Sequence, residues 1–175
     1  MKLLLHICCG PCSLYVIDKL KELLNNNGDS ITGIFANPNI HPYDEFLRRQ
    51  ESTKIACVTK NIPVIILDDF DKEKWENYSG IKQNRCSMCY NTRLDMVSKY
   101  AKENSFTHFT TTLLVSPYQN KDLIKSEGER LAEIYGINFL YSDFSEGFRE
   151  GQKQAKELGL YRQKYCGCIK SLSER

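Results

Sequence analysis

Seven of the eight cysteines of this 175-residue chain fall into three short groups, at residues 8–12, 86–89 and 166–168, and Cys57 stands alone. Cytosolic thiols are kept reduced, so grouped cysteines in a chain with a full apolar core indicate metal binding or redox catalysis rather than disulfides. One cubane iron–sulfur cluster takes four thiolates, and a structural zinc site takes at most four. Seven thiols therefore predict two centres, or one centre with a thiol pair beside it.

The first group, Cys8, Cys9 and Cys12, directly follows an apolar run at 2–7 that predicts a buried strand. Its loop has a single glycine, Gly10, and matches neither the dinucleotide-binding nor the Walker pattern. The positive end of the next helix is expected to lower the pKa of Cys12 and to favour its thiolate, the form that binds iron or zinc. Three clustered thiols at the end of a strand therefore predict metal ligands.

The other two groups leave more than one interpretation open. Cys86 and Cys89 form a Cys-x-x-Cys motif at a predicted helix start, where both sulfurs share one side and can bind one metal or form a redox disulfide. By itself this motif is also typical of half of a structural zinc site. Cys166 and Cys168 suit one ligand plus one free thiol, or a reducible disulfide. Cys57, inside a predicted helix, is interpreted as a core cysteine.

Polar, aromatic and basic side chains follow the predicted strands or precede the third cysteine group. Hydroxyl and amide groups near the fourth strand can hydrogen-bond a polar ligand, and basic residues between tyrosines can pair with phosphate while the rings stack on bases. His41 also fits a structural role between two prolines, and the threonines also fit plain strand propensity. The candidate substrate-binding residues are His41, Thr110, Thr112, Ser116, Tyr118, Gln119, Arg162 and Lys164.

The elements that must position these side chains alternate along the chain. Short apolar or threonine-rich runs predict strands at 2–7, 31–36, 64–67, 106–114 and 138–141. Helical spacing predicts helices at 13–24 (capped by Ser13), 42–61, 72–78, 87–104, 121–135 and 148–158. Residues 81–92 are expected to be an inserted or extended helical piece.

This alternation predicts an α/β, Rossmann-like, doubly wound fold, with a mainly parallel five-stranded sheet and helices on both faces. We expect a single domain over 1–175 with a cysteine-containing tail at about 160–175. In such a sheet the ligand lies beyond the carboxyl ends of the strands, which is where the first cysteine group falls.

The distribution of charge and of apolar residues limits the classes of partner that the protein can bind. Residues 147–175 carry seven lysines and arginines against three glutamates, so this segment is +4 in a chain of net charge +2. Such a patch can meet the phosphates of a nucleic acid, although a solvated helix face and tail fits it equally well. No apolar run approaches the ~20 residues of a membrane span. The run Lys2–Leu5 begins like a signal peptide, but His6 and Gly10 interrupt it, so we expect a cytoplasmic protein.

Five blocks of this sequence occur in one order and together resemble the epoxyqueuosine reductase family of the QueH type, from residue 3 to about residue 171. The tail block is the most distinctive. The blocks are Cys8-Cys9-Gly10-Pro11-Cys12, Asn37-Pro38-Asn39-Ile40-His41-Pro42, Arg85-Cys86-Ser87-Met88-Cys89, Phe109-Thr110-Thr111-Thr112-Leu113-Leu114 with Ser116-Pro117, and Tyr161-Arg162-Gln163-Lys164-Tyr165-Cys166-Gly167-Cys168.

The resemblance implies a Rossmann-like domain of the HUP type, related to the adenine-nucleotide alpha-hydrolases. It also implies an activity: removal of the epoxide oxygen from epoxyqueuosine at the wobble position of tRNA, which gives queuosine. The implied cofactors are a 4Fe–4S cluster and an additional mononuclear iron, without cobalamin, and the electron donor is unidentified.

Carried over by motif, the metal ligands are Cys8, Cys9, Cys12, Cys86 and Cys89, and Cys12 is assigned to the additional iron. Cys166 and Cys168 match the tail motif as ligands or as a redox pair. The catalytic candidates are Cys12 and Tyr161; a nearby thiol, Tyr161 or His6 would supply a proton.

Two other classes of protein fit the residues alone. One is a zinc-stabilised nucleotide- or RNA-binding module without redox chemistry, which the metal content and colour of the purified protein would distinguish. The other is a thiol–disulfide oxidoreductase, which would show thiol exchange without any metal.

Overall fold

The computed structural model describes residues 1–71 and 73–174. Its centre is a five-stranded sheet of order β3-β2-β1-β4-β5, in which every pairing is parallel. The strands are β1 (Lys2–His6), β2 (Ser30–Ala36), β3 (Val64–Leu67), β4 (His108–Thr111) and β5 (Asn138–Phe139). This arrangement confirms the predicted Rossmann-like α/β fold.

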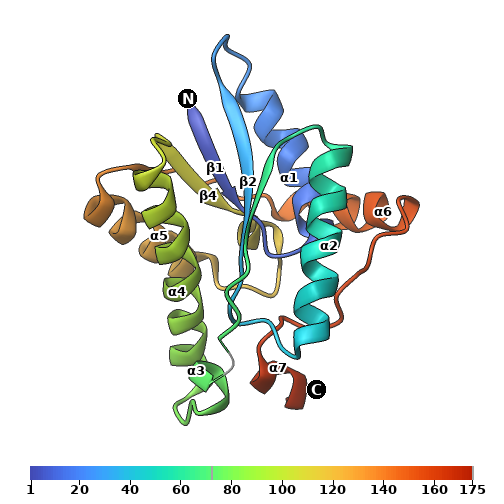
Figure 1. Ribbon diagram of the computed structural model, residues 1–175, viewed down its shortest axis with the longest axis vertical. Helices are drawn as coiled ribbons and strands as arrows, with labels where there is room; N and C mark the ends of the chain where they lie inside the picture. Colours follow the sequence, from blue (N-terminus) through green and yellow to red (C-terminus); the bar gives the residue numbers. More distant parts are fainter. Residues whose placement is uncertain (72, 175) are drawn as a thin grey trace.

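Helices cover both faces of the sheet, as Figure 1 shows. One face carries α1 (Gly10–Leu23), α2 (Tyr43–Thr59) and α6 (Phe148–Glu157), with α1 packed between the other two. The opposite face carries α4 (Lys82–Glu103) and α5 (Lys121–Tyr135), which pack against each other. The central strand β1 is therefore buried on both sides, and Leu3, Leu4 and Leu5 are fully buried, as is typical of a parallel sheet.

Shorter elements complete the fold. They are α3 (Glu73–Glu76), the 3-10 turns η1 (Thr112–Val115) and η2 (Ser145–Gly147), and α7 (Ile169–Ser173) in the tail. The predicted helix at 72–78 corresponds to α3, and Lys72 lies outside the described residues. No helix in the described part of the chain is long and apolar enough to cross a membrane.

Three predictions of element ends and caps were wrong. The strand predicted to reach residue 114 ends at Thr111, because the Thr111 hydroxyl accepts a hydrogen bond from the Leu113 amide (3.1 Å) and turns the chain into η1. Ser13 does not cap α1; Cys9 occupies the N-cap position, and the Ser13 hydroxyl donates to the Gly10 carbonyl (2.7 Å). Helix α4 begins five residues before the predicted Ser87, so the 81–92 piece extends this helix.

The start of α1 approaches α2 very closely. A Cβ atom on Gly10 would lie 2.4 Å from the backbone oxygen of Ser52, so only glycine fits at this point. This close approach fixes the strand–helix junction that carries the first cysteine group.

Candidate metal centre and its cavity

A buried histidine joins three strands beneath the cysteines. His6 ends β1, and its Nδ1 atom lies 2.8 Å from the Thr111 hydroxyl at the end of β4. Its Nε2 atom lies 3.2 Å from both the Ala36 carbonyl oxygen and the Asn37 side-chain oxygen after β2. Burial lowers the pKa of His6 to about 3, so the ring is neutral at physiological pH. His6 therefore links the ends of β1, β2 and β4 at the carboxyl edge of the sheet, where the thiols of the first cysteine group lie.

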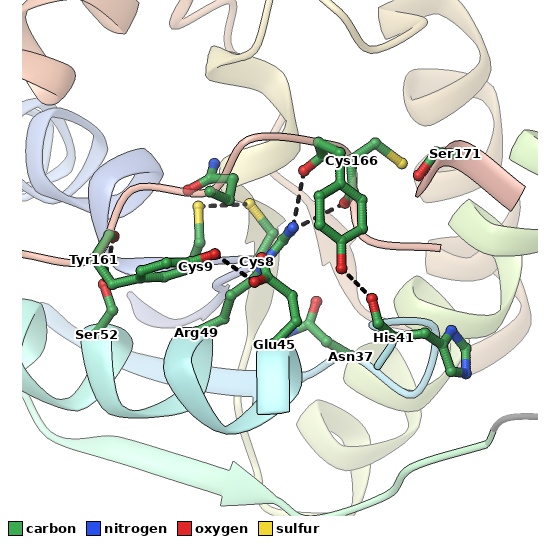
Figure 2. A network of polar contacts seen from close by, with 12 residues as sticks. Cys8, Cys9, Asn37, His41, Glu45, Arg49, Ser52, Tyr161, Cys166 and Ser171 are labelled. Atoms are coloured by element: carbon green, nitrogen blue, oxygen red, sulfur yellow. Dashed lines mark hydrogen bonds and ion pairs between the residues drawn. The ribbon is translucent and has the colours of Figure 1, made fainter. Parts of the chain in front are cut away.

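The first cysteine group converges on one point. The sulfur atoms of Cys8, Cys9 and Cys12 are buried and lie within 4.8 Å of one another. Those of Cys8 and Cys9 are 3.7 Å apart, and Figure 2 shows these two thiols side by side. Thr112 positions Cys8, because its hydroxyl accepts from the Cys8 amide (3.1 Å) and donates to the Cys8 sulfur (3.3 Å). Within residues 1–71 and 73–174, this trio is the one group of three or more metal-donor side chains so closely spaced.

The trio favours one thiolate. Hydrogen bonds from the Cys12 and Cys9 thiols hold the pKa of Cys8 well below its usual range, and the Arg93 guanidinium adds to this effect. The same contact with Cys8 raises the pKa of Cys12, so the predicted lowering at the helix start was wrong and the thiolate falls on Cys8 instead; burial raises the pKa of Cys9. A thiolate with two thiols beside it is a soft, preorganised donor set, which suits iron or zinc.

The second and third cysteine groups face each other. Cys89 of α4 packs with Cys168 of the tail against the buried ring of Trp75. Burial raises the pKa of Cys86, and it raises that of Cys89 to about 11; the charge of Cys166 contributes to both shifts. The Cys168 thiol donates to Cys166 and thereby holds the pKa of Cys166 well below its usual range. The tail motif therefore lies against the Cys-x-x-Cys motif.

Cys57 belongs to neither group. It is fully buried in α2 within the main apolar core, and burial raises its pKa to about 12. The prediction of a core cysteine is confirmed.

The segment 160–174, here called the tail strap, is tied across the carboxyl edge of the sheet. Arg49 of α2 donates to the carbonyl oxygens of Tyr165 (2.8 Å) and Cys166 (3.0 Å), and its side chain is paired with Glu45 at 2.7 Å (Figure 2). The Tyr165 hydroxyl donates to the carbonyl oxygen of His41. These contacts hold the third cysteine group at the carboxyl edge of the sheet, where Cys166 lines the same cavity as Cys8 and Cys12.

The same strap is held at its turn and at both ends. At its turn, Gly167 has φ +123°, a conformation that favours glycine, and its carbonyl oxygen accepts from the His41 amide at 2.8 Å. Near its start, the Gln163 amide lies 3.5 Å from the Cys12 sulfur. At its end, Arg85 of α4 donates to both carboxylate oxygens of Glu174, at 2.7 and 2.9 Å.

We expect Arg49→Met to destabilise the protein by about 3 to 5 kcal/mol, because it leaves the buried Glu45 carboxylate without its cation and frees two strap carbonyls. Urea denaturation measures the loss. The matched control is Arg48→Met, which removes the neighbouring exposed arginine that lies 5.7 Å from the Tyr161 ring centre and is expected to cost about 1 kcal/mol or less. Equal losses for the two variants would contradict the role of Arg49 as an anchor.

A cavity of about 540 Å³ opens between the trio and the tail strap. Its wall combines thiols, cations and neutral polar or aromatic groups. Lining residues include Cys8, Cys12, Cys166, Arg49, Arg93, Arg162, Lys164, Ser116, Tyr118, Gln119 and Phe148. A cavity of this size can hold a nucleoside-sized ligand.

Five of the predicted substrate-binding residues line this cavity: Ser116, Tyr118, Gln119, Arg162 and Lys164. Tyr118 is 82% exposed, and its ring packs edge-on against that of Phe148 with 5.9 Å between ring centres. The Arg162 guanidinium donates to the side chain of Gln152 (3.0 Å). The side-chain oxygen of Gln119 accepts from the Tyr90 hydroxyl (2.9 Å).

The other predicted site residues are engaged elsewhere. The Thr110 hydroxyl donates to the Leu140 carbonyl beyond β5 (2.7 Å). His41 is buried beside Phe70, and its Nε2 atom lies 3.2 Å from the Asp71 carbonyl oxygen. The Tyr161 hydroxyl donates to the Glu45 carboxylate, and burial together with this bond raises the pKa of Tyr161.

Sequence reasoning missed two buried arginines of the site. Arg93 donates from Nη2 (2.7 Å) and Nε (3.1 Å) to the Asn37 side-chain oxygen, and its Nη1 atom lies 3.9 Å from the Cys89 sulfur. The available signal was its position four residues after Cys89, which places both on one side of a helix. Arg49 shows the same spacing, four residues after Glu45.

Fold and site together define a Rossmann-like protein with a thiol-rich centre at the carboxyl edge of its sheet. The family model of the epoxyqueuosine reductase QueH matches residues 3–174. The chain therefore belongs to the epoxyqueuosine reductase QueH family, a family of oxidoreductases, as its sequence blocks predicted.

Individual relatives agree with this assignment. Epoxyqueuosine reductase QueH of Helicobacter pylori is 38% identical over 95% of this chain, which spans only 48% of that relative's length. The QueH protein of Dehalococcoides mccartyi is 32% identical over 99% of this chain and 94% of its own. Among solved structures, the chain is similar to U34-tRNA thiolase NcsA from Methanococcus maripaludis with its 4Fe–4S cluster, with a TM-score of 0.57 and 17% sequence identity. The match covers 99% of this chain and 63% of the NcsA chain. That likeness shows the fold alone.

Proposed function

We propose that this protein removes the epoxide oxygen of epoxyqueuosine at the wobble position of tRNA and so forms queuosine. Membership of the QueH family supports the activity. The observation that carries the proposal is that buried, clustered thiols open onto a cavity bordered by Arg162 and Lys164. The reaction consumes two electrons and two protons, replaces two carbon–oxygen bonds by a carbon–carbon double bond, and releases the oxygen as water. A low-potential one-electron donor has to supply the electrons.

The thiols suit an iron–sulfur cofactor. The trio offers three buried sulfur donors within 4.8 Å, one of them a favoured thiolate, and a further thiol, Cys166, lines the same cavity. In this proposal Cys8, Cys9, Cys86 and Cys89 hold a 4Fe–4S cluster and Cys12 holds an additional iron. Cys166 and Cys168 serve as further ligands or as a redox pair. Such a cluster, when bound, supplies electrons one at a time.

The chain's own residues bind and orient the tRNA. The Arg162 and Lys164 cations pair with phosphates of the anticodon loop, and the Ser116 hydroxyl and Gln119 amide hydrogen-bond the modified nucleoside. The Tyr161 hydroxyl is bound to Glu45, so in this proposal Tyr161 supports the strap.

The test begins with anaerobic purification and measurement of iron and acid-labile sulfide. The loaded protein is then given a low-potential reductant and tRNA carrying epoxyqueuosine, without cobalamin, and the digested nucleosides are analysed by mass spectrometry. We expect the loss of one oxygen atom. Iron-replete protein that leaves epoxyqueuosine unchanged would overturn the proposal. Colourless protein with stoichiometric zinc would favour the RNA-binding module, and metal-independent thiol exchange would favour the oxidoreductase.

Reversing the charges at Arg162 and Lys164 is expected to weaken tRNA binding. Each lost phosphate contact should reduce the slope of log affinity against log salt by roughly 0.7 to 0.9. The measurement is a binding titration at several salt concentrations with Arg162→Glu/Lys164→Glu. Lys54→Glu/Lys125→Glu, which reverses two cations with half-exposed side chains outside the cavity lining, is the control. An unchanged affinity and slope in the first variant would refute the assignment.

A further inference from the structure

Among the buried arginines, Arg93 differs in its partners. Arg49 is paired with Glu45, and Arg85 is paired with Glu174. Arg93 is only 3% exposed, yet within residues 1–71 and 73–174 it forms no ion pair with a carboxylate. A buried guanidinium without a counter-charge is costly, so some negative charge is expected beside it.

The neighbours of Arg93 show where that charge can reside. Its Nε and Nη2 atoms donate to the side-chain oxygen of Asn37, which is a neutral amide. Its remaining nitrogen, Nη1, lies 3.9 Å from the Cys89 sulfur, and Arg93 shares the cavity wall with three thiols, Cys8, Cys12 and Cys166. Arg93 therefore lies beside Cys89 of the second cysteine group and lines the cavity together with thiols of the first and third groups.

The guanidinium is held rigidly in this position. Asn37, which accepts two of its hydrogen bonds, donates its own amide to the Ile7 carbonyl oxygen at 2.8 Å, directly before the first cysteine group. The cation is therefore fixed relative to the loop that carries Cys8 and Cys9. A charge that does not need to reorganise acts strongly on its neighbours in a low-dielectric site.

We propose that Arg93 is the fixed counter-charge of the thiolate-held redox centre and that it raises the reduction potential of that centre. The proposal rests on the iron–sulfur cofactor of the proposed function. One-electron reduction adds one negative charge, so a nearby cation stabilises the reduced form more than the oxidised form. Net charge and hydrogen bonding are among the determinants of cluster potentials.

The test compares anaerobically isolated, loaded proteins in spectroelectrochemical titrations without tRNA. Arg93→Gln removes the charge, Arg93→Lys keeps it, and Arg130→Gln removes an exposed arginine that is paired with Glu127 on α5. We expect Arg93→Gln to lower the equilibrium constant of one-electron reduction at least tenfold, which is 59 mV. Arg93→Lys keeps the charge, so its potential should fall by less than half as much as that of Arg93→Gln. The potential of Arg130→Gln should match that of the unaltered protein.

Several results would overturn this role. One is an unchanged potential in an Arg93→Gln protein of full iron and sulfide content. Another is a fall of 59 mV or more in Arg93→Lys, which would make the hydrogen bonds of Arg93, and not its charge, responsible for the potential. This result can be measured even where Arg93→Gln does not fold. Weaker tRNA binding by Arg93→Gln with an unchanged potential would reassign Arg93 to phosphate. An unaltered protein that contains no iron would remove the proposed cofactor itself, a failure distinct from the others.

Discussion

Cys12→Ala is expected to abolish the conversion of epoxyqueuosine while leaving much of the cluster absorbance in place. The Cys12 sulfur lines the cavity and lies 3.5 Å from the Gln163 amide of the tail strap, so it borders the site where the proposed substrate would bind. In the proposed function it holds the additional iron, whereas other thiols hold the cluster. Nucleoside analysis by mass spectrometry, together with iron and sulfide content, measures the two effects separately.

The matched control is Cys57→Ala, which makes the same change at the isolated core thiol. That variant should lose some stability through the small cavity it creates, but it should keep its iron and its activity. Turnover by the Cys12→Ala protein at a rate close to that of the unaltered protein would contradict the assignment. Complete loss of the cluster in this variant would instead place Cys12 among the cluster ligands.

The second large effect is expected from Cys86→Ser and Cys89→Ser, each of which should lose the cluster and therefore the activity. These thiols stand one helical turn apart on α4, opposite the tail strap that carries Cys166. A serine hydroxyl is a much poorer iron ligand than a thiolate. Iron and acid-labile sulfide per protein, measured after anaerobic reconstitution, report the loss.

Cys57→Ser serves as the control for this pair, because Cys57 is buried in α2 outside both thiol groups. Its iron content should stay near that of the unaltered protein. If all three serine variants lost iron to the same extent, the division of the cysteines into grouped ligands and one core thiol would be wrong.

The order of the elements was predictable from local patterns. Apolar or threonine-rich runs identified every strand of the sheet, and the central strand is strongly apolar because it is buried on both faces, as Leu3 to Leu5 are. The ends of elements were less predictable. The turn at Thr111 and the early start of α4 at Lys82 depend on individual hydrogen bonds and on packing that the apolar pattern does not contain.

The chemistry of the site was also determined largely by the sequence. Clustered thiols directly after the first strand have to lie at the carboxyl edge of the sheet, because all strands of a parallel sheet point the same way. The structure places Cys8, Cys9 and Cys12 there, with their sulfurs within 4.8 Å. The position of Cys57 in the apolar core, away from the other thiols, was likewise predictable because no other cysteine lies near it in the sequence.

Only the tertiary structure decided which distant groups meet. Arg49 draws the tail onto α2, so that Cys166 faces Cys86 and Cys89 from about 80 residues away in the chain. The same packing turns the Tyr161 hydroxyl to Glu45 and places Arg93 beside thiols without a carboxylate partner within the described residues. Local spacing contains no information on such contacts, because their geometry comes from helices docking on opposite faces of one sheet.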